Sequence, residues 1–246
     1  SCAKHETIPD ITFDLYIIIC RDKIKIVGGR KMSYTDLFIA VVEMLGTVSF
    51  ACSGAMTGIR RNMDLLGVVI MGVVTAVGGG VIRDLILGII PPGMFVNPVY
   101  TLVASCTAVV VFTISYLRKR NSVRKKKFEL LYDKFLVYSD TLGLGIFTVS
   151  GIQTAIDNGY KTTFLLLFVG AVTGTGGGVL RDVLAMQKPY IFMKNDIYAC
   201  ASIAGALVCI CTWNTLGQVN AMLAGMLTAV IIRMAAIKFR IRLPQV

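Results

Sequence analysis

Long uncharged runs of apolar residues constrain the fold of this chain more than any other feature. Residues 65–82, 99–117 and 162–180 each run for 18 or 19 positions without a formal charge. A helix rises about 1.5 Å per residue, so each run is long enough to cross the roughly 30 Å hydrocarbon core of a bilayer. A fourth run, residues 197–232, has 36 residues, and the polar stretch around Trp213 indicates a turn between two helices. These runs predict a membrane protein.

The spans are expected to be helices, because a membrane barrel would show alternating segments of about ten residues, which are not seen. The composition agrees, with 55% hydrophobic and 16% charged residues. Two further apolar runs contain one carboxylate each, Glu43 and Asp140. The sequence therefore predicts an all-α membrane protein with seven transmembrane helices, at residues 34–58, 63–88, 96–118, 134–156, 161–186, 195–213 and 216–236.

Basic residues are distributed unevenly among the predicted loops. The formal net charge is +11, but 16 basic residues fall on one side of the seven helices and only Lys161 falls in loops on the other. The positive-inside rule then predicts a multi-pass protein of the cell membrane with its N-terminus outside and its C-terminus in the cytoplasm. The basic run at residues 124–127 is interpreted as an orientation signal beside anionic membrane lipids. Specific lipid recognition is the alternative, and no nucleic-acid partner is expected.

The chain also repeats itself at an offset of 97 to 98 residues. The aligned positions are Glu43 with Asp140, Ser53 with Ser150, Thr75 with Thr173, Gly78 to Gly80 with Gly176 to Gly178, Arg83-Asp84 with Arg181-Asp182, and Tyr100 with Tyr198. Because each copy holds three helices, an odd number, the second copy must enter the membrane in the opposite sense. The sequence predicts an inverted 3+3 repeat followed by a seventh helix that packs through small residues.

Six segments follow from this organisation. They are an N-terminal tail at residues 1–33, a three-helix repeat at 34–118, a basic cytoplasmic loop at 119–133, a second repeat at 134–213, the seventh helix at 214–236 and a basic cytoplasmic tail at 237–246. The first segment carries six basic residues on the predicted outer side, and its apolar stretch is too short for a signal peptide or a span. We expect Met32 to be the natural start and residues 1–31 to be non-native.

Three consecutive glycines occur in the second helix of each copy, at Gly78, Gly79 and Gly80 and at Gly176, Gly177 and Gly178. Each glycine costs a helix roughly 1 kcal/mol relative to alanine, so a break or kink is expected there. Broken backbone inside a bilayer is tolerated only where protein buries it or water reaches it. We interpret both triplets as kinks that face a polar path, with close helix packing as the alternative.

Six ionisable residues are predicted to lie within the membrane, namely Glu43, Arg83, Asp84, Asp140, Arg181 and Asp182. Position along the helices places the first three in the outer half and the others in the inner half. Charges at such depths are costly unless they are paired or hydrated. The sequence predicts two ion pairs, Glu43 with Arg83 and Asp140 with Arg181, with the two following aspartates as further partners or helix-end groups. The pairs are either part of a functional interior or a structural clamp.

Five hydroxyl side chains near the triplets are candidates for lining a pore or contacting an ion: Ser53, Thr75, Ser150, Thr173 and Thr175. Hydrogen bonding to their own helices is the alternative. The seven cysteines show no Cys-X-X-Cys spacing, and the only histidine, His5, lies in the N-terminal tail. Neither a metal site, a cofactor nor a catalytic residue is expected.

The paired Gly-Gly-Gly-X-X-Arg-Asp motif, the segment from Phe50 to Gly54 and residues 63–67 resemble the bacterial branch of the trimeric intracellular cation channel (TRIC) family. Bacterial relatives of this family are also labelled glycine transporters. The resemblance covers residues 34–236 and implies a homotrimer with a pore in each subunit. It further implies passage of monovalent cations, chiefly potassium, past the kinked second and fifth helices. The Lys-Glu-Val motif of the animal members is absent, so phosphoinositide regulation is not expected.

Two functions remain open from the sequence. The leading hypothesis is a passive potassium-permeable channel, gated around the glycine triplets. The alternative is a carrier of glycine or another small neutral amino acid, whose charged ends would meet freed backbone amides and carbonyls. An enzyme is not expected, because no nucleophile with an adjacent base appears in the spans.

Overall fold

The computed structural model describes residues 34–120, 125–187 and 197–239. The chain divides into two compact units, residues 1–37 and residues 38–246, and the first contributes only the beginning of one helix to the described part. The expectation of a non-native segment at residues 1–31 therefore lies outside the described residues.

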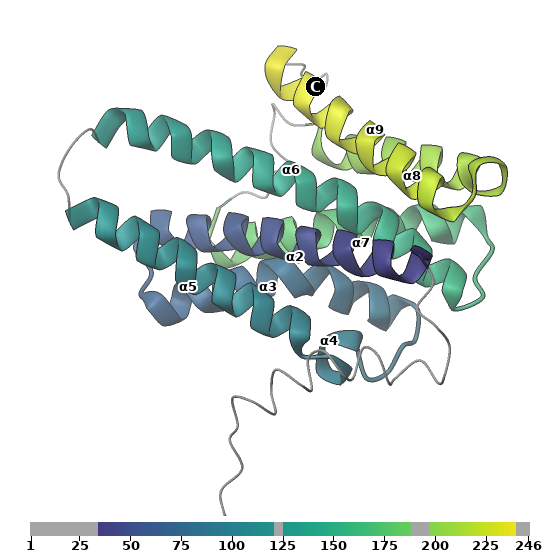
Figure 1. The fold of residues 1–246 in the computed structure, drawn as a ribbon, viewed down its shortest axis with the longest axis horizontal. Coiled ribbons are helices and arrows are strands. Elements are labelled where there is room, and N and C mark those ends of the chain that lie inside the picture. Colours follow the sequence, from purple (N-terminus) through teal and green to yellow (C-terminus); the bar gives the residue numbers. More distant parts are fainter. Residues whose placement is uncertain (1–33, 121–124, 188–196, 240–246) are drawn as a thin grey trace, which may run out of the picture. The chain divides into compact units, whose positions relative to one another are not determined.

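All regular structure in the described ranges is α-helical (Figure 1). The helices are α2 (Tyr34–Arg60), α3 (Leu65–Ile86), α4 (Gly93–Val96), α5 (Val99–Arg120), α6 (Lys125–Asp157), α7 (Thr163–Leu184), α8 (Tyr198–Leu216) and α9 (Gln218–Phe239). Every one of these except the short α4 is long and apolar enough to cross a membrane, which gives seven candidate spans in the described ranges. The prediction of an all-α protein with seven spans is confirmed, and the ends differ from those predicted by a few residues.

The predicted basic loop at residues 119–133 is largely helical, which corrects its assignment as a loop. α5 continues to Arg120, and α6 begins at Lys125, before its apolar span. Lysine, glutamate and leucine dominate the start of α6 and favour helix, so helical structure extends beyond the apolar part. The hydroxyl of Tyr132 donates a hydrogen bond of 2.8 Å to the backbone carbonyl of Met56 on α2. Burial raises the pKa of Tyr132, so its hydroxyl keeps the proton that it donates.

Both ends of α3 follow from local chemistry. Before its first residue, Asp64 has an extended backbone, and its carboxylate accepts a 2.8 Å hydrogen bond from the backbone N–H of Gly67. Such a cap satisfies one of the free amides at a helix start. After Ile86, Gly88 has a φ of +71°, a left-handed conformation that ends the helix. The chain then reverses through α4 toward the start of α5.

α6 is the most enclosed span. Within its most apolar stretch 72% of the residues are buried, against 11% in α5, so α6 is central and α5 peripheral. α6 contacts α7, α8 and α9, while α3 contacts α5 and α7. Figure 1 shows α8 and α9 side by side, and these two helices are in extensive contact. Exposed apolar side chains such as Leu45, Ile70, Val110 and Leu227 cover outer helix faces, as expected of surfaces in contact with lipid.

The two glycine triplets meet where α3 contacts α7. Helical structure continues through both triplets, which corrects the prediction of a helix break. A methyl group on Gly79 would overlap the backbone carbonyl oxygen of Thr173, and one on Gly177 would overlap that of Thr75. The missing side chains therefore allow two helix backbones to touch, which outweighs the helix propensity lost by glycine. These reciprocal contacts are the arrangement expected of an inverted repeat, which stays a prediction.

Candidate functional site

Two groups of charged side chains flank the contact between α3 and α7. We call Glu43, Arg83 and Asp84 the first cluster. We call Asp140, Arg181, Asp182 and Arg233 the second cluster. Helices α2 and α3 supply the first cluster, whereas α6, α7 and α9 supply the second.

Asp140 joins two arginines in the second cluster. Its Oδ1 accepts a hydrogen bond of 2.5 Å from Nη1 of Arg181, and its Oδ2 accepts one of 2.7 Å from Nη2 of Arg233. Arg181 also pairs with Asp182, with Nη2 and Oδ1 2.9 Å apart, and donates to the hydroxyl of Ser53 at 2.5 Å. Each of the four charged side chains is at most 5% exposed. Two carboxylates and two guanidinium groups thus share one buried site with no formal net charge, as buried charges require.

Glu43 has different partners in the first cluster. Its Oε2 accepts a 2.6 Å hydrogen bond from the hydroxyl of Tyr100, and its Oε1 accepts one of 2.8 Å from Ser150. Arg83 instead pairs with Asp84, whose Oδ1 lies 2.8 Å from Nε and 2.7 Å from Nη2. The predicted ion pair between Glu43 and Arg83 is therefore not formed in this structure.

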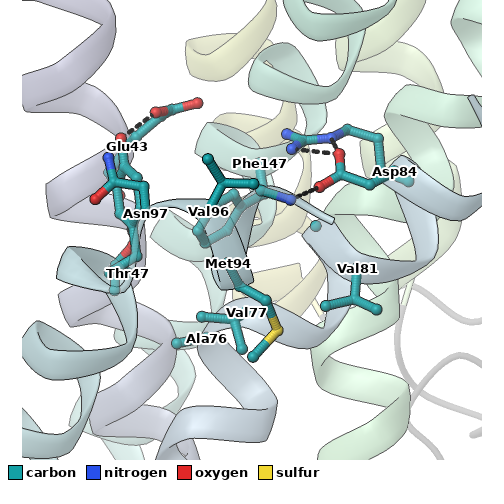
Figure 2. A pocket seen from close by; sticks show the side chains of 14 residues that line it. Glu43, Thr47, Ala76, Val77, Val81, Asp84, Met94, Val96, Asn97 and Phe147 are labelled. Carbon is teal, nitrogen blue, oxygen red and sulfur yellow. Dashed lines mark hydrogen bonds and ion pairs between the residues drawn. The ribbon is translucent and has the colours of Figure 1, made fainter. Parts of the chain in front are cut away.

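The loop after α3 explains why Arg83 has this partner. Asp84 follows it directly in the chain, and the backbone N–H of Gly93 donates a 2.7 Å hydrogen bond to Oδ2 of Asp84. This bond fixes the carboxylate, so the adjacent guanidinium can use Oδ1 without ordering a second side chain. Figure 2 shows both interactions as dashed lines on one side of the site, with Glu43 on the other.

A cavity of about 280 Å³ lies within the first cluster (Figure 2). Its apolar lining includes Phe147, and its polar lining is Glu43, Thr47, Arg83, Asp84, Asn97 and Tyr100. The charged lining residues are two carboxylates and one guanidinium, so the cavity has a formal net charge of −1. Its acceptors are oxygen atoms, the ligand type that hard cations prefer. No group of three or more histidine, cysteine, aspartate or glutamate side chains that could hold a metal ion occurs in the described ranges.

Equivalent glycines of the two triplets have different surroundings. Gly80 lines the cavity, and the nearest atom to a methyl group added there would be Nη2 of Arg83 at 3.9 Å. A methyl group added to Gly178 would overlap the hydroxyl of Tyr198 and would lie 3.6 Å from Oδ1 of Asp140. The first cluster is therefore open where the second is filled.

None of the five predicted hydroxyl residues is in the lining of this cavity. Thr75, Thr173 and Thr175 each donate to the carbonyl four residues earlier in their own helix, over 2.6, 2.6 and 2.7 Å. Ser53 and Ser150 contact the charged side chains described above. The three threonines therefore hydrogen-bond to the backbone of their own helices, which was the alternative to contact with an ion.

Three residues that belong to these clusters or contact them, Tyr100, Tyr198 and Arg233, are not identified as site residues by sequence reasoning. Tyr100 and Tyr198 align in the repeat, and that alignment is the signal that could have identified them. Arg233 follows directly on the uncharged run at residues 197–232, so it resembles a charge at a helix end. In the structure it is 4% exposed, and its Cζ lies 4.0 Å from the centroid of the Tyr198 ring.

Known sequences resemble this chain over most of its length. A family profile described as "Glycine transporter" matches residues 40–116 and 137–214. The UPF0126 inner membrane protein YadS of Escherichia coli (strain K12) is 35% identical over 205 residues, which cover 82% of this chain and 93% of that protein. The UPF0126 membrane protein YvgT of Bacillus subtilis (strain 168) is 30% identical over 204 residues, which cover 83% and 94%.

Solved structures share the fold over a similar extent. The TRIC trimeric intracellular cation channel orthologue from Rhodobacter sphaeroides has a TM-score of 0.72 at 30% identity and covers 82% of this chain and 98% of its own. A prokaryotic TRIC channel in 0.5 M KCl has a TM-score of 0.74 at 28% identity and covers 84% and 99%. The relatives and the solved structures therefore cover a similar share of this chain.

Proposed function

The chain belongs to the bacterial branch of the TRIC family, and we propose that it is a cation channel that conducts chiefly potassium through each subunit of a homotrimer. The observation that carries the proposal is the cavity in the first cluster. It holds a formal net charge of −1 within helices that are long and apolar enough to cross a membrane. Charge inside a membrane protein is costly, so an uncompensated carboxylate facing a cavity marks a place where a cation is stabilised.

Glu43 is suited to this role by its hydrogen bonds. Both carboxylate oxygens accept from neutral hydroxyl groups, at 2.6 and 2.8 Å. A carboxylate has about four acceptor positions, so two remain for an ion or its water. Asn97 and Thr47 add further oxygen atoms to the same lining. A partly dehydrated potassium ion could exchange some of its water for these oxygens.

The contact between the two glycine triplets is where α3 and α7 could move apart to open the conduction path. At their contact the backbones of α3 and α7 touch at Gly79 and Gly177, while the side chains of Leu180 and Ile82 pack against Gly78 and Gly176. The six glycines themselves carry no side chains that would have to repack if the helices slid or bent. We propose that gating occurs at this contact, around Gly78 to Gly80 and Gly176 to Gly178. From the basic residues in the loops and the positive-inside rule, we expect the first cluster to lie toward the outside and the second toward the cytoplasm.

Recordings from purified protein in planar bilayers test the proposal. We expect unitary potassium currents, and we expect Glu43→Gln to lower the conductance because it removes the uncompensated charge. Asp157→Asn is the matched control, since it removes a carboxylate from the exposed end of α6, where Asp157 accepts a hydrogen bond from Gln153 of the same helix. An absence of unitary currents from folded protein contradicts the proposal.

One observation favours a second candidate, a carrier of glycine or another small zwitterion. The cavity presents charges of both signs, Glu43 for an ammonium group and Arg83 for a carboxylate. Uptake of labelled glycine into vesicles separates the two functions. Saturable uptake without unitary currents supports the carrier, whereas currents without uptake support the channel.

A further inference from the structure

α9 adds to the second cluster a charge that the first cluster does not have. Glu43 and Asp140 are equivalent in the repeat, and each lies beside a glycine triplet. Glu43 accepts from neutral hydroxyl groups and faces a cavity. Asp140 accepts from two guanidinium groups, and only that of Arg181 comes from the repeat. The other belongs to Arg233 on α9, which stands outside the repeat.

Arg233 is surrounded by the groups that hold a small cation. Its Nη2 lies 2.7 Å from Oδ2 of Asp140, and its Nε donates to the hydroxyl of Thr141 at 3.0 Å. Its Cζ lies 4.0 Å from the centroid of the Tyr198 ring. A carboxylate, a hydroxyl oxygen and an aromatic face each attract a cation in a site that excludes water. Tyr198 is the repeat equivalent of Tyr100, which bonds Glu43 in the first cluster.

The formal charges of the two clusters differ by this one side chain. With the guanidinium of Arg233 in place, the second cluster is neutral and filled. Without it, two carboxylates and one guanidinium would remain, with a net charge of −1, as in the first cluster. Arg233 therefore neutralises the second cluster at Asp140. In the first cluster no described side chain plays this part, and the cavity at Glu43 is left to a cation from solution.

The hydrogen bonding of the Arg233 guanidinium is incomplete. Its Nη1 is buried and has no hydrogen-bond partner in the part of the chain that the structure describes. A buried donor without a partner is unfavourable, which weakens the guanidinium's preference for this position. Arg233 also lies toward the end of α9, which runs to Phe239, so a small movement of that end would withdraw it.

We propose that Asp140 is a second cation site on the conduction path and that the guanidinium of Arg233 occupies it as a built-in competing cation. A potassium ion reaches Asp140 only after this guanidinium has moved away. Arg233 thus limits conduction at the end of the path opposite the first cluster. The inference rests on the proposed channel function.

Single-channel recording of Arg233→Ala tests the proposal, with free guanidinium ion as the probe. We expect an increase of about tenfold or more in mean potassium current, the size expected for losing one charge-assisted hydrogen bond. We also expect guanidinium, added on the side where α9 ends, to block Arg233→Ala at a concentration about tenfold lower than it blocks the unmodified protein. The added ion would refill the position that the variant leaves empty.

Two controls separate this role from general effects of charge. Arg233→Lys keeps a cation on α9 and should retain low current and weak guanidinium block. Lys238→Gln removes an exposed positive charge from the same helix and should behave as the unmodified protein. If Arg233→Ala does not fold, Thr141→Val removes one partner of the guanidinium and should raise the current by a smaller factor.

The outcomes are distinct. Higher current with sensitised guanidinium block supports the inference. Unchanged or lower current in folded Arg233→Ala, or equal block of both proteins, overturns it while leaving the channel function intact. An absence of cation current from every folded variant and from the unmodified protein overturns the proposed function itself.

Discussion

Replacing Gly79 with alanine should destabilise the protein, whereas the same change at Gly80 should not. A methyl group on Gly79 would overlap the carbonyl oxygen of Thr173 and would lie 3.3 Å from the backbone nitrogen of Gly177. Both are backbone atoms, which cannot rotate away as a side chain can. At Gly80 the nearest atom is Nη2 of Arg83 at 3.9 Å, which is an ordinary contact.

The magnitude follows from two opposing terms. Alanine gains up to about 1 kcal/mol over glycine in helix propensity. Inserting a methyl group into a tightly packed contact costs about 1–3 kcal/mol. Only the first term applies at Gly80, and the second is at the upper end of its range at Gly79 because two helices must separate. We therefore expect the variants to differ by about 3 kcal/mol, or roughly 6–12 °C in Tm for a chain of this size.

Thermal unfolding of purified protein in one detergent measures this difference by far-ultraviolet circular dichroism. Gly177→Ala should behave as Gly79→Ala does, because its methyl group would overlap the carbonyl oxygen of Thr75. Equal Tm shifts for the variants at Gly79 and Gly80 would refute the close contact of α3 with α7.

Three further changes probe the clusters. Asp140→Asn leaves two buried guanidinium groups without that carboxylate, so we expect a loss of about 3–5 kcal/mol in unfolding free energy, measured as a lower Tm or as loss of folded protein in size-exclusion chromatography. Tyr100→Phe removes one donor to Glu43 and should cost about 1–3 kcal/mol, while potassium currents persist in bilayer recordings because the carboxylate remains. Thr75→Val should leave unitary conductance unchanged, since this hydroxyl bonds its own helix; a fall in conductance would show instead that the hydroxyl contacts the ion.

The seven spans could be predicted from the sequence because the thickness of the bilayer sets the length of an uncharged run. The role of the glycines could not. A glycine triplet shows that Cβ atoms are absent, but their absence permits either a helix break or a close backbone approach. The structure shows the approach, because Gly79 meets Thr173 of a helix that is distant in the sequence. The start of α6 before its apolar span could not be predicted either. Basic residues mark the boundary of a membrane span, but they are also good helix formers.

The sequence predicted most of the charged residues in the two clusters, but it did not predict all of their partners. Depth along the helices brings Glu43 and Arg83 to one cavity, yet the choice of Asp84 as the partner depends on the backbone N–H of Gly93 in the following loop. Pattern reasoning could not foresee that hydrogen bond. Arg233 was missed because it comes from a helix without a counterpart in the repeat, so no alignment points to it.

The conduction of potassium through the cavity at Glu43 is tested most directly by unitary currents between unequal KCl solutions. We expect discrete current steps that reverse close to the equilibrium potential of potassium and that become smaller in Glu43→Gln. Folded protein that gives no steps, or steps that reverse close to the equilibrium potential of chloride, would contradict the proposed channel.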